Sequence, residues 1–327
     1  YKFAYRTATG QKIGFPFGGL QEFNSAATTE SLTGSFTSTT INSYLGRAKY
    51  DFQSKYFIEG TVRWDASSRF APENRWGFFP AVGVSWVLSE EEFIRGVPFI
   101  NVLKFRASYG RLGNEGLTSR FPYLSTFSTG YDQLSYPGIY LDQLGNEDLR
   151  WEKQGNFNVG IDFTLWENRL NGSVDYFDKR SIDLLFSRPL VFSGGIPSVD
   201  YNIGEISNRG VEFFLNVTPV RKNNFTWDVS LNMTKLTNEI TKLTDRDTLA
   251  PAGSYRFVVG KSRFEFYLPE WAGVDEQDGS PLWYKDELDA TGNPTGKKLT
   301  VKEYEEATRH WVGTGVPKIT GGFSNRF

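Results

Sequence analysis

Apolar and polar residues alternate along much of this chain, in stretches of about eight to ten positions separated by turns. In residues 157–165 the odd positions carry Phe, Val, Ile, Phe and Leu, whereas the even positions carry Asn, Gly, Asp and Thr. Successive side chains of a β-strand point to opposite faces, so this strand has one face suited to hydrocarbon and one suited to water. A tilted strand of this length also spans a bilayer. The pattern is therefore typical of the wall of a transmembrane β-barrel.

The same alternation recurs along the chain and predicts about nine antiparallel strands. They cover residues 43–52, 55–64, 77–88, 102–111, 157–165, 170–178, 209–219, 225–236 and 318–327. Residues 1–40 are rich in Thr, Ser and Gly, and we expect them to form a loop with at most one poor strand. The predicted fold class is thus all-β.

The connections between these strands alternate between short and long. Tight turns are predicted at 53–54, 166–169 and 221–224, and long loops at about 65–76, 112–150, 179–208 and 237–317. Short periplasmic turns and long extracellular loops are the arrangement of bacterial outer-membrane barrels. One connection on the short side, residues 89–101, is expected to hold a short helix capped by Ser89. A soluble β-sandwich also alternates, but the lopsided connections favour the barrel.

Composition supports a barrel and excludes several other classes. Aromatic residues make up 16% of the chain, and many lie near predicted strand ends, as in the interfacial girdles of membrane proteins. No run of about 18 apolar residues exists, so a transmembrane helix is excluded and a barrel is the remaining way to span a membrane. The net charge of −2 gives no electrostatic basis for binding nucleic acid. The lack of cysteine excludes disulfides and thiolate metal sites.

The residues offer little basis for catalysis. The single histidine, His310, follows a polar stretch (301–308) that resembles a short surface helix, and we interpret it as a solvated surface residue. Residues 275–280 faintly resemble a calcium loop but lack its closing Glu, so an Asp-Gly turn is the simpler interpretation. We predict that the protein is not an enzyme and uses no cofactor or catalytic metal.

Aromatic residues in the predicted loops fit two interpretations. Aromatic side chains stack on sugar rings and grip protein partners, but long loops also use them to build small cores of their own. The candidates for contact with a ligand or partner are Trp76, Tyr131, Trp151, Trp271 and Trp283.

Several motifs, in this order and combination, resemble the SusC/RagA family of TonB-dependent outer-membrane transporters. They include LGRAKYDF at 45–52, NRWGFFP at 74–80, LKFRASYG at 103–110, NRGVE at 208–212 and PKITGGFSN at 317–325. One departure is Asp65-Ala66-Ser67-Ser68, where the family usually has Gly in the second position.

The resemblance implies that residues 1–327 are the later, C-terminal part of a plugged barrel of about 22 strands. About nine strands cannot close such a barrel, so we expect a longer polypeptide whose plug and N-terminal region lie outside this chain. The polar strand faces would line the lumen and hold the plug. The lumen-facing candidates are Arg47, Lys49, Glu59, Arg63, Lys104, Arg106, Asp162, Asp175, Glu212, Asp228 and Arg326.

The resemblance also implies a function and partners. It indicates an active importer of oligosaccharides or peptides in the outer membrane of a Gram-negative bacterium. Its implied partners are a SusD-like surface lipoprotein that acts as a lid, TonB, and outer-membrane lipids. The alternative is a SusC-like barrel that serves as a structural subunit of a larger outer-membrane assembly.

Overall fold

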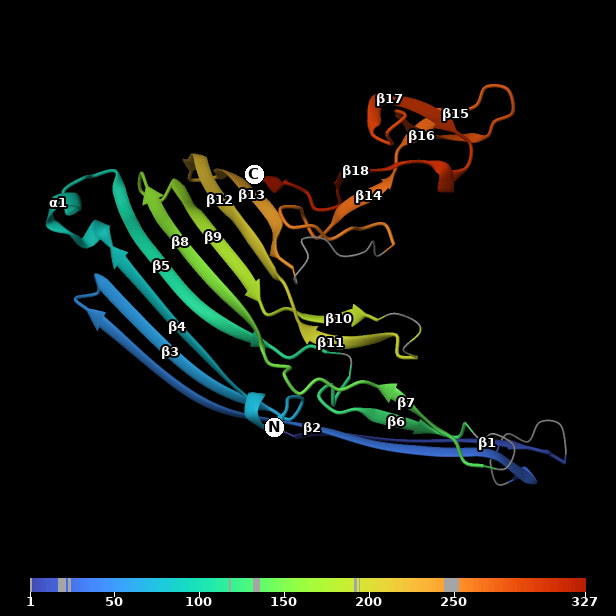
Figure 1. The fold of residues 1–327 in the computed structure, drawn as a ribbon. Helices are drawn as coiled ribbons and strands as arrows, with labels where there is room; N and C mark the ends of the chain where they lie inside the picture. Colours follow the sequence, from blue (N-terminus) through green and yellow to red (C-terminus); the bar gives the residue numbers. More distant parts are fainter. Residues whose placement is uncertain are drawn as a thin grey trace.

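The computed structural model describes residues 2–16, 22, 25–117, 119–131, 136–190, 193, 195–243 and 253–327. Its main feature is one antiparallel sheet of ten strands in the order β1-β2-β3-β4-β5-β8-β9-β12-β13-β19. The sheet curves across its strands like a segment of a barrel wall (Figure 1). The strands are β1 (Lys2–Ile13), β2 (Thr28–Phe52), β3 (Tyr56–Ser67), β4 (Trp76–Val87), β5 (Ile100–Asn114), β8 (Glu152–Leu165), β9 (Leu170–Ile182), β12 (Glu205–Lys222), β13 (Phe225–Lys242) and β19 (Ile319–Arg326).

The nine predicted strands are confirmed, but the prediction that residues 1–40 form a loop was wrong. β1 pairs with the first part of β2 in a long hairpin, which extends beyond the end of the wall (Figure 1). Its residues are exposed on both faces, so no apolar alternation marks it in the sequence. Thr and Ser instead pair across the hairpin, as between the hydroxyls of Thr7 and Ser35, 2.8 Å apart.

The short connections lie at one end of the wall. Gln53 and Ser54 both have φ of 54° in the β2–β3 turn, where the Asp51 carboxylate accepts a hydrogen bond from the Ser54 amide. The β4–β5 connection contains a 3-10 turn (Leu88–Glu90) and the short helix α1 (Glu92–Arg95), as predicted. Ser89 does not cap α1, because Glu91 occupies the N-cap position.

Glu91 fastens this connection to the wall. Its carboxylate accepts hydrogen bonds from the Tyr56 hydroxyl (2.6 Å) and the Trp86 indole (3.0 Å), and Lys55 lies 3.4 Å away. The Tyr56 hydrogen bond holds the pKa of Glu91 below its ordinary value.

The long connections contain smaller sheets at the opposite end of the wall (Figure 1). None of the helices within the described ranges is long and apolar enough to cross a membrane. The small elements are β6 (Thr126–Thr129) with β7 (Ile139–Gln143), β10 (Leu185–Pro189) with β11 (Ser198–Asn202), β14 (Glu265–Pro269) with β18 (Arg309–Thr314), and β15 (Trp271–Val274) with β16 (Pro281–Leu288) and β17 (Pro294–Val301).

A small buried cluster, the rim core, joins the wall to these connections. It consists of Phe70, Phe79, Leu149 and Trp151. The Trp151 indole donates a 2.7 Å hydrogen bond to the Arg75 carbonyl, so its one polar atom is satisfied. Nearby, the Arg69 guanidinium donates to the carbonyls of Glu115 and Leu117. The rim core thereby ties the β3–β4, β5–β6 and β7–β8 connections together.

Candidate functional site

Strand register sorts the side chains of the wall into two faces. Residues directly opposite on neighbouring antiparallel strands point to the same side. One such row runs Ile58, Val84, Ala107, Val159, Tyr176 and Val211 across the wall. Many of these side chains are exposed apolar groups, as expected of a surface that meets lipid.

All of the lumen-facing candidates share the other, polar face by register. Lys49 lies opposite Glu59, Lys104 opposite Asp162, and Asp175 opposite Glu212. The remaining candidates on these strands alternate with them in the same way: Arg47, Arg63, Arg106 and Asp228. Arg326, at the far edge, lies opposite Asp228. We expect this face to line the lumen when the barrel is complete.

Ion pairs organise the polar face around Arg106. Its guanidinium lies 3.0 Å from Asp162 and 2.8 Å from Asp175, so one cation joins carboxylates on two neighbouring strands. A second pair links Arg47 to Glu59 at 2.7 Å. Glu212 extends the acidic side of the face next to Asp175. These charged side chains are stabilised by hydration and by their ion pairs, because they are not buried in an apolar core.

The centre of the polar face is shallow because its side chains are small. Ala81, Gly83 and Ser85 of β4 lie beside Ser108 and Gly110 of β5. A hollow of about 630 Å³ lies over these residues, with Lys49, Glu59, Lys104 and Arg106 among those that line it. This strip of small side chains with charged residues at its borders is called the charged lane. Its shape is suited to lining a passage or to packing against a domain inside the barrel.

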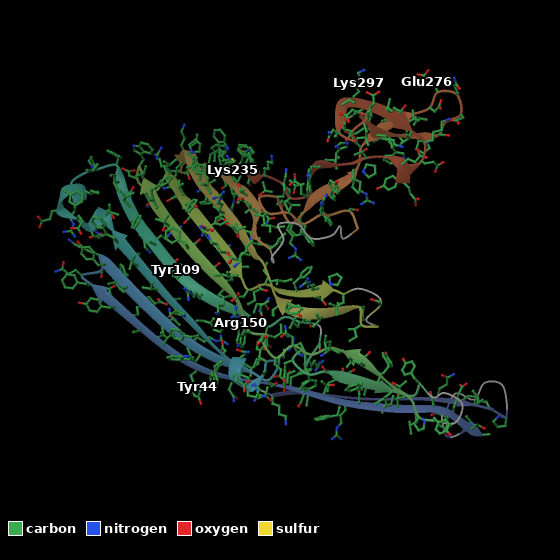
Figure 2. The ribbon with its side chains drawn as sticks, in the orientation of Figure 1. Tyr44, Tyr109, Arg150, Lys235, Glu276 and Lys297 are labelled. Atoms are coloured by element: carbon green, nitrogen blue, oxygen red, sulfur yellow. The ribbon has the colours of Figure 1, made fainter. Side chains whose placement is uncertain are left out.

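Two of the predicted loop contacts require correction. Trp151 is only 6% exposed because it belongs to the rim core, so it cannot meet a ligand. Trp76 is exposed, but it stacks on Tyr44 at 5.9 Å, and its register places it on the apolar face. Trp76 is therefore suited to the membrane interface rather than to ligand contact. Figure 2 shows Tyr44 at the edge of the wall.

The other three loop candidates remain available. Tyr131 is exposed and packs edge-on against Tyr140, with ring centres 4.4 Å apart. Trp271 is 52% exposed and packs edge-on against Trp283 at 5.1 Å, and Trp283 in turn contacts Tyr304. These pairs combine self-packing with an exposed aromatic face, so both interpretations of the loop aromatics apply to them.

The acidic turn at 275–280 is held by a lysine. Lys302 lies 2.7 Å from both Asp275 and Asp278, and the turn closes through the Asp275 amide and the Ser280 carbonyl. Within the described ranges, no group of three or more His, Cys, Asp or Glu side chains is arranged to hold a metal. The contacts of Lys302 therefore support the interpretation of residues 275–280 as a turn.

His310 departs from its predicted setting. It lies in β18, half-buried, with its Nε2 atom 3.1 Å from the Asp286 carboxylate, rather than fully solvated. The polar stretch before it forms a single 3-10 turn (Tyr304–Glu306).

We expect Lys302→Gln to loosen the 275–280 turn in a pH-dependent manner. The Lys302 hydrogen bond lowers the pKa of Asp278 from 3.8 to about 2. A lowered carboxyl pKa stabilises the fold above its ordinary value, and this contribution is lost as the pH falls from 3.8 to about 2. Hydrogen exchange of this segment should therefore be faster in the variant at neutral pH, and the two proteins should converge near pH 2. Lys297→Gln, on neighbouring β17, is the control that should not change the exchange.

The sequence did not point to two residues at the rim. Phe79 covers both Gly77 and Gly113, where an added Cβ would lie 2.4 Å and 2.1 Å from its ring. Arg69 joins two connections through backbone carbonyls. The only available signal was their place in the family motifs, since a pattern of alternation does not show which side chains meet across loops.

Comparison with known proteins shows which family this wall belongs to. A family model described as TonB dependent receptor-like, beta-barrel, matches residues 1–311. TonB-dependent receptor P39 of Formosa agariphila is 37% identical over 328 residues, covering 89% of this chain and 31% of that protein. TonB-dependent receptor SusC of Bacteroides thetaiotaomicron is 34% identical over 266 residues, covering 75% of this chain and 26% of SusC. The chain thus spans about a third or less of the relatives it matches.

Comparison with solved structures leads to the same family. The RagAB peptide importer in its closed-closed state superposes with a TM-score of 0.85 and 28% identity, covering 99% of this chain and 36% of that chain. The wall is therefore a segment of an outer-membrane β-barrel, which is incomplete and not closed. The chain belongs to the SusC/RagA family of TonB-dependent receptors, whose members are outer-membrane proteins of Gram-negative bacteria. These relatives are receptors and transporters, not enzymes.

Proposed function

We propose that the intact protein is an active importer of oligosaccharides or peptides in the outer membrane, energised through TonB. The observation that carries this proposal is the close match of the whole wall segment to the RagAB peptide importer. The similarity to SusC supports the same class. The charged lane on the polar face provides a water-compatible surface along which a polar solute can move.

We further propose that this polar face borders the plug and the ligand passage, and that a SusD-like lipoprotein covers the long-loop end. The lysine and arginine side chains of β2 and β5 and the carboxylates of β8, β9 and β12 would hold an insert through ion pairs and hydrogen bonds. The long connections at the opposite end from the tight turns would contact ligand and lid.

The experiment is to delete the gene in its host and measure uptake of labelled oligosaccharides and peptides, and to identify the subunits that copurify with the tagged full-length protein. An importer should lose uptake of one ligand class and copurify with one SusD-like lipoprotein. Unchanged uptake of both classes, together with several unrelated subunits, would instead identify a structural subunit of a larger assembly.

Trp271→Ala should weaken uptake at low substrate concentration by about threefold to tenfold, because it removes an exposed aromatic face at the long-loop end. Trp166→Ala is a matched control, since Trp166 is 54% exposed but lies in the tight β8–β9 turn at the other end. An equal loss of uptake in both variants would exclude a specific role for Trp271.

A further inference from the structure

Four cations lie on the apolar face of the wall, between its middle and its long-loop end. Arg111, Gly155, Arg180, Ser207 and Glu239 form one row across β5, β8, β9, β12 and β13. The next row toward the turns is Tyr109, Phe157, Asp178, Arg209 and Thr237. The third is Ala107, Val159, Tyr176, Val211 and Lys235. Arg111, Arg180, Arg209 and Lys235 are here called the outer patch.

The outer patch lies where the strands leave the hydrocarbon. A barrel strand crosses the membrane in about 9–11 residues. Counted from the turn end of each strand, Arg180 is the eleventh residue of β9, Lys235 the eleventh of β13 and Arg111 the twelfth of β5. Long loops follow on this side, so the patch meets the outer leaflet. Figure 2 shows Tyr109 and Lys235 on the wall that carries it.

The patch has more positive than negative charge. The neighbouring acids are Asp178, which accepts from Arg180 at 2.8 Å, and Glu239, which accepts from Arg209 at 3.2 Å. A third, Glu205, lies near Arg180 and is 3.9 Å from another cation, Lys242. Arg111 donates to the neutral Tyr109 hydroxyl at 3.3 Å and has no ion pair among the residues that the structure describes. All four cations are exposed. A guanidinium has five N–H donors, so Arg180 and Arg209 keep donors beyond these ion pairs.

Lys235 is unusual among the four cations because its neighbours are apolar. Its row is otherwise apolar, with Val211 on one side and Ile319 on the other. An ammonium group among such neighbours extends toward the polar boundary of the membrane, where an anion can reach it. This direction leads toward the row that contains Arg209.

Gly155 lies between Arg111 and Arg180 in their row. A Cβ at this position would lie 3.4 Å from the Tyr109 hydroxyl. The Tyr109 hydroxyl therefore lies beside Gly155, in the row that also carries Arg111 and Arg180. Arginine forks match phosphate oxygens in geometry as well as charge.

We propose that Arg111, Arg180, Arg209 and Lys235 bind the phosphate groups of a phosphorylated glycolipid in the outer leaflet. A lipid is the occupant because the patch lies on the face that meets lipid, with Lys235 inside the apolar belt and the three arginines above it. A phosphorylated headgroup complements the excess of cations. The proposal depends on the membrane position of the wall and not on what the protein transports.

The test compares binding of lipid A that carries both phosphates with binding of fully dephosphorylated lipid A, using full-length protein in detergent and native mass spectrometry. The wild-type protein should retain the phosphorylated form far better. The triple variant Arg111→Gln/Arg180→Gln/Lys235→Gln should lower this affinity by about 100-fold, since each cation near a charged lipid surface contributes about fivefold.

A control triple variant removes the same charge elsewhere: Arg188→Gln, Lys222→Gln and Lys297→Gln, all exposed and outside the patch. It should bind as the wild type does. Equal binding of the two lipids by the wild-type protein would overturn the proposal whether or not the patch variant folds. Undiminished binding by a folded patch variant would also overturn it, as would complete displacement of the lipid by inorganic phosphate, which would indicate a site for a free anion.

Discussion

Trp151→Ala should lower the free energy of unfolding by about 3–5 kcal/mol, the usual cost of truncating a buried tryptophan. Trp151 is 6% exposed, and its ring contacts Phe70 and Phe79, each with ring centres 5.4 Å away. The substitution leaves a cavity in the rim core and removes the hydrogen bond to the Arg75 carbonyl. Denaturant unfolding of the full-length protein in detergent measures the effect.

Limited proteolysis gives a second, local measurement of the same change. The β3–β4 and β7–β8 connections should be cleaved faster in Trp151→Ala, because the rim core holds both. Trp271→Ala is the control, since the Trp271 ring is 52% exposed and its edge-on contact with Trp283 should contribute only about 1 kcal/mol. Equal costs for the two variants would show that the rim core does not stabilise the protein.

Arg106→Met should lower the free energy of unfolding by about 1–2 kcal/mol, the second largest of the expected effects on stability. It leaves the carboxylates of Asp162 and Asp175 without the cation that joins them, next to Glu212. The figure lies below that for a buried pair because water reaches all of these groups and screens them. The same unfolding measurement applies, and raising the salt concentration should reduce the difference.

A charge-removal cycle tests the cause. Adding Asp162→Asn and Asp175→Asn to Arg106→Met should restore most of the lost stability, because no unpaired carboxylates then remain at this site. Arg47→Met is the matched control on the same face, since its pair with Glu59 is more exposed and should contribute less. If the triple variant is less stable than Arg106→Met, repulsion between carboxylates is not the cause.

The wall was predictable from the sequence because each of its strands carries apolar side chains on the face toward lipid and polar side chains on the face toward water. The alternation at 157–165 is therefore enough to assign Asp162 and Phe163 to opposite faces. The β1–β2 hairpin was not predictable in this way, because it has no buried face and so no apolar period. Its strands are fixed by backbone pairing and by hydroxyl contacts such as Thr7 to Ser35, which leave only a weak mark on the sequence.

The charged candidate residues share one face of the wall by register, as strand parity predicts, whereas Trp76 and Trp151 do not lie in exposed loops. Side chains alternate between the two faces of a strand, so the position of Arg47 or Glu212 along its strand is enough to determine its face. Nothing comparable fixes Trp151, which is buried against Phe70 of the β3–β4 connection and Phe79 of β4. Trp76 begins β4 rather than ending a loop, so strand parity, applied one residue earlier, would have placed it on the apolar face.

The rim core has a consequence for how a ligand would be received. A loop that becomes ordered only when a ligand arrives subtracts its lost conformational entropy from the binding free energy. Here Phe70, Leu149 and Trp151 already fix the β3–β4 and β7–β8 connections, so that entropy is lost during folding. In the importer that we propose, the neighbouring mouth of the barrel would thus be preorganised, and capture of a ligand there would depend on the shape that this mouth already has.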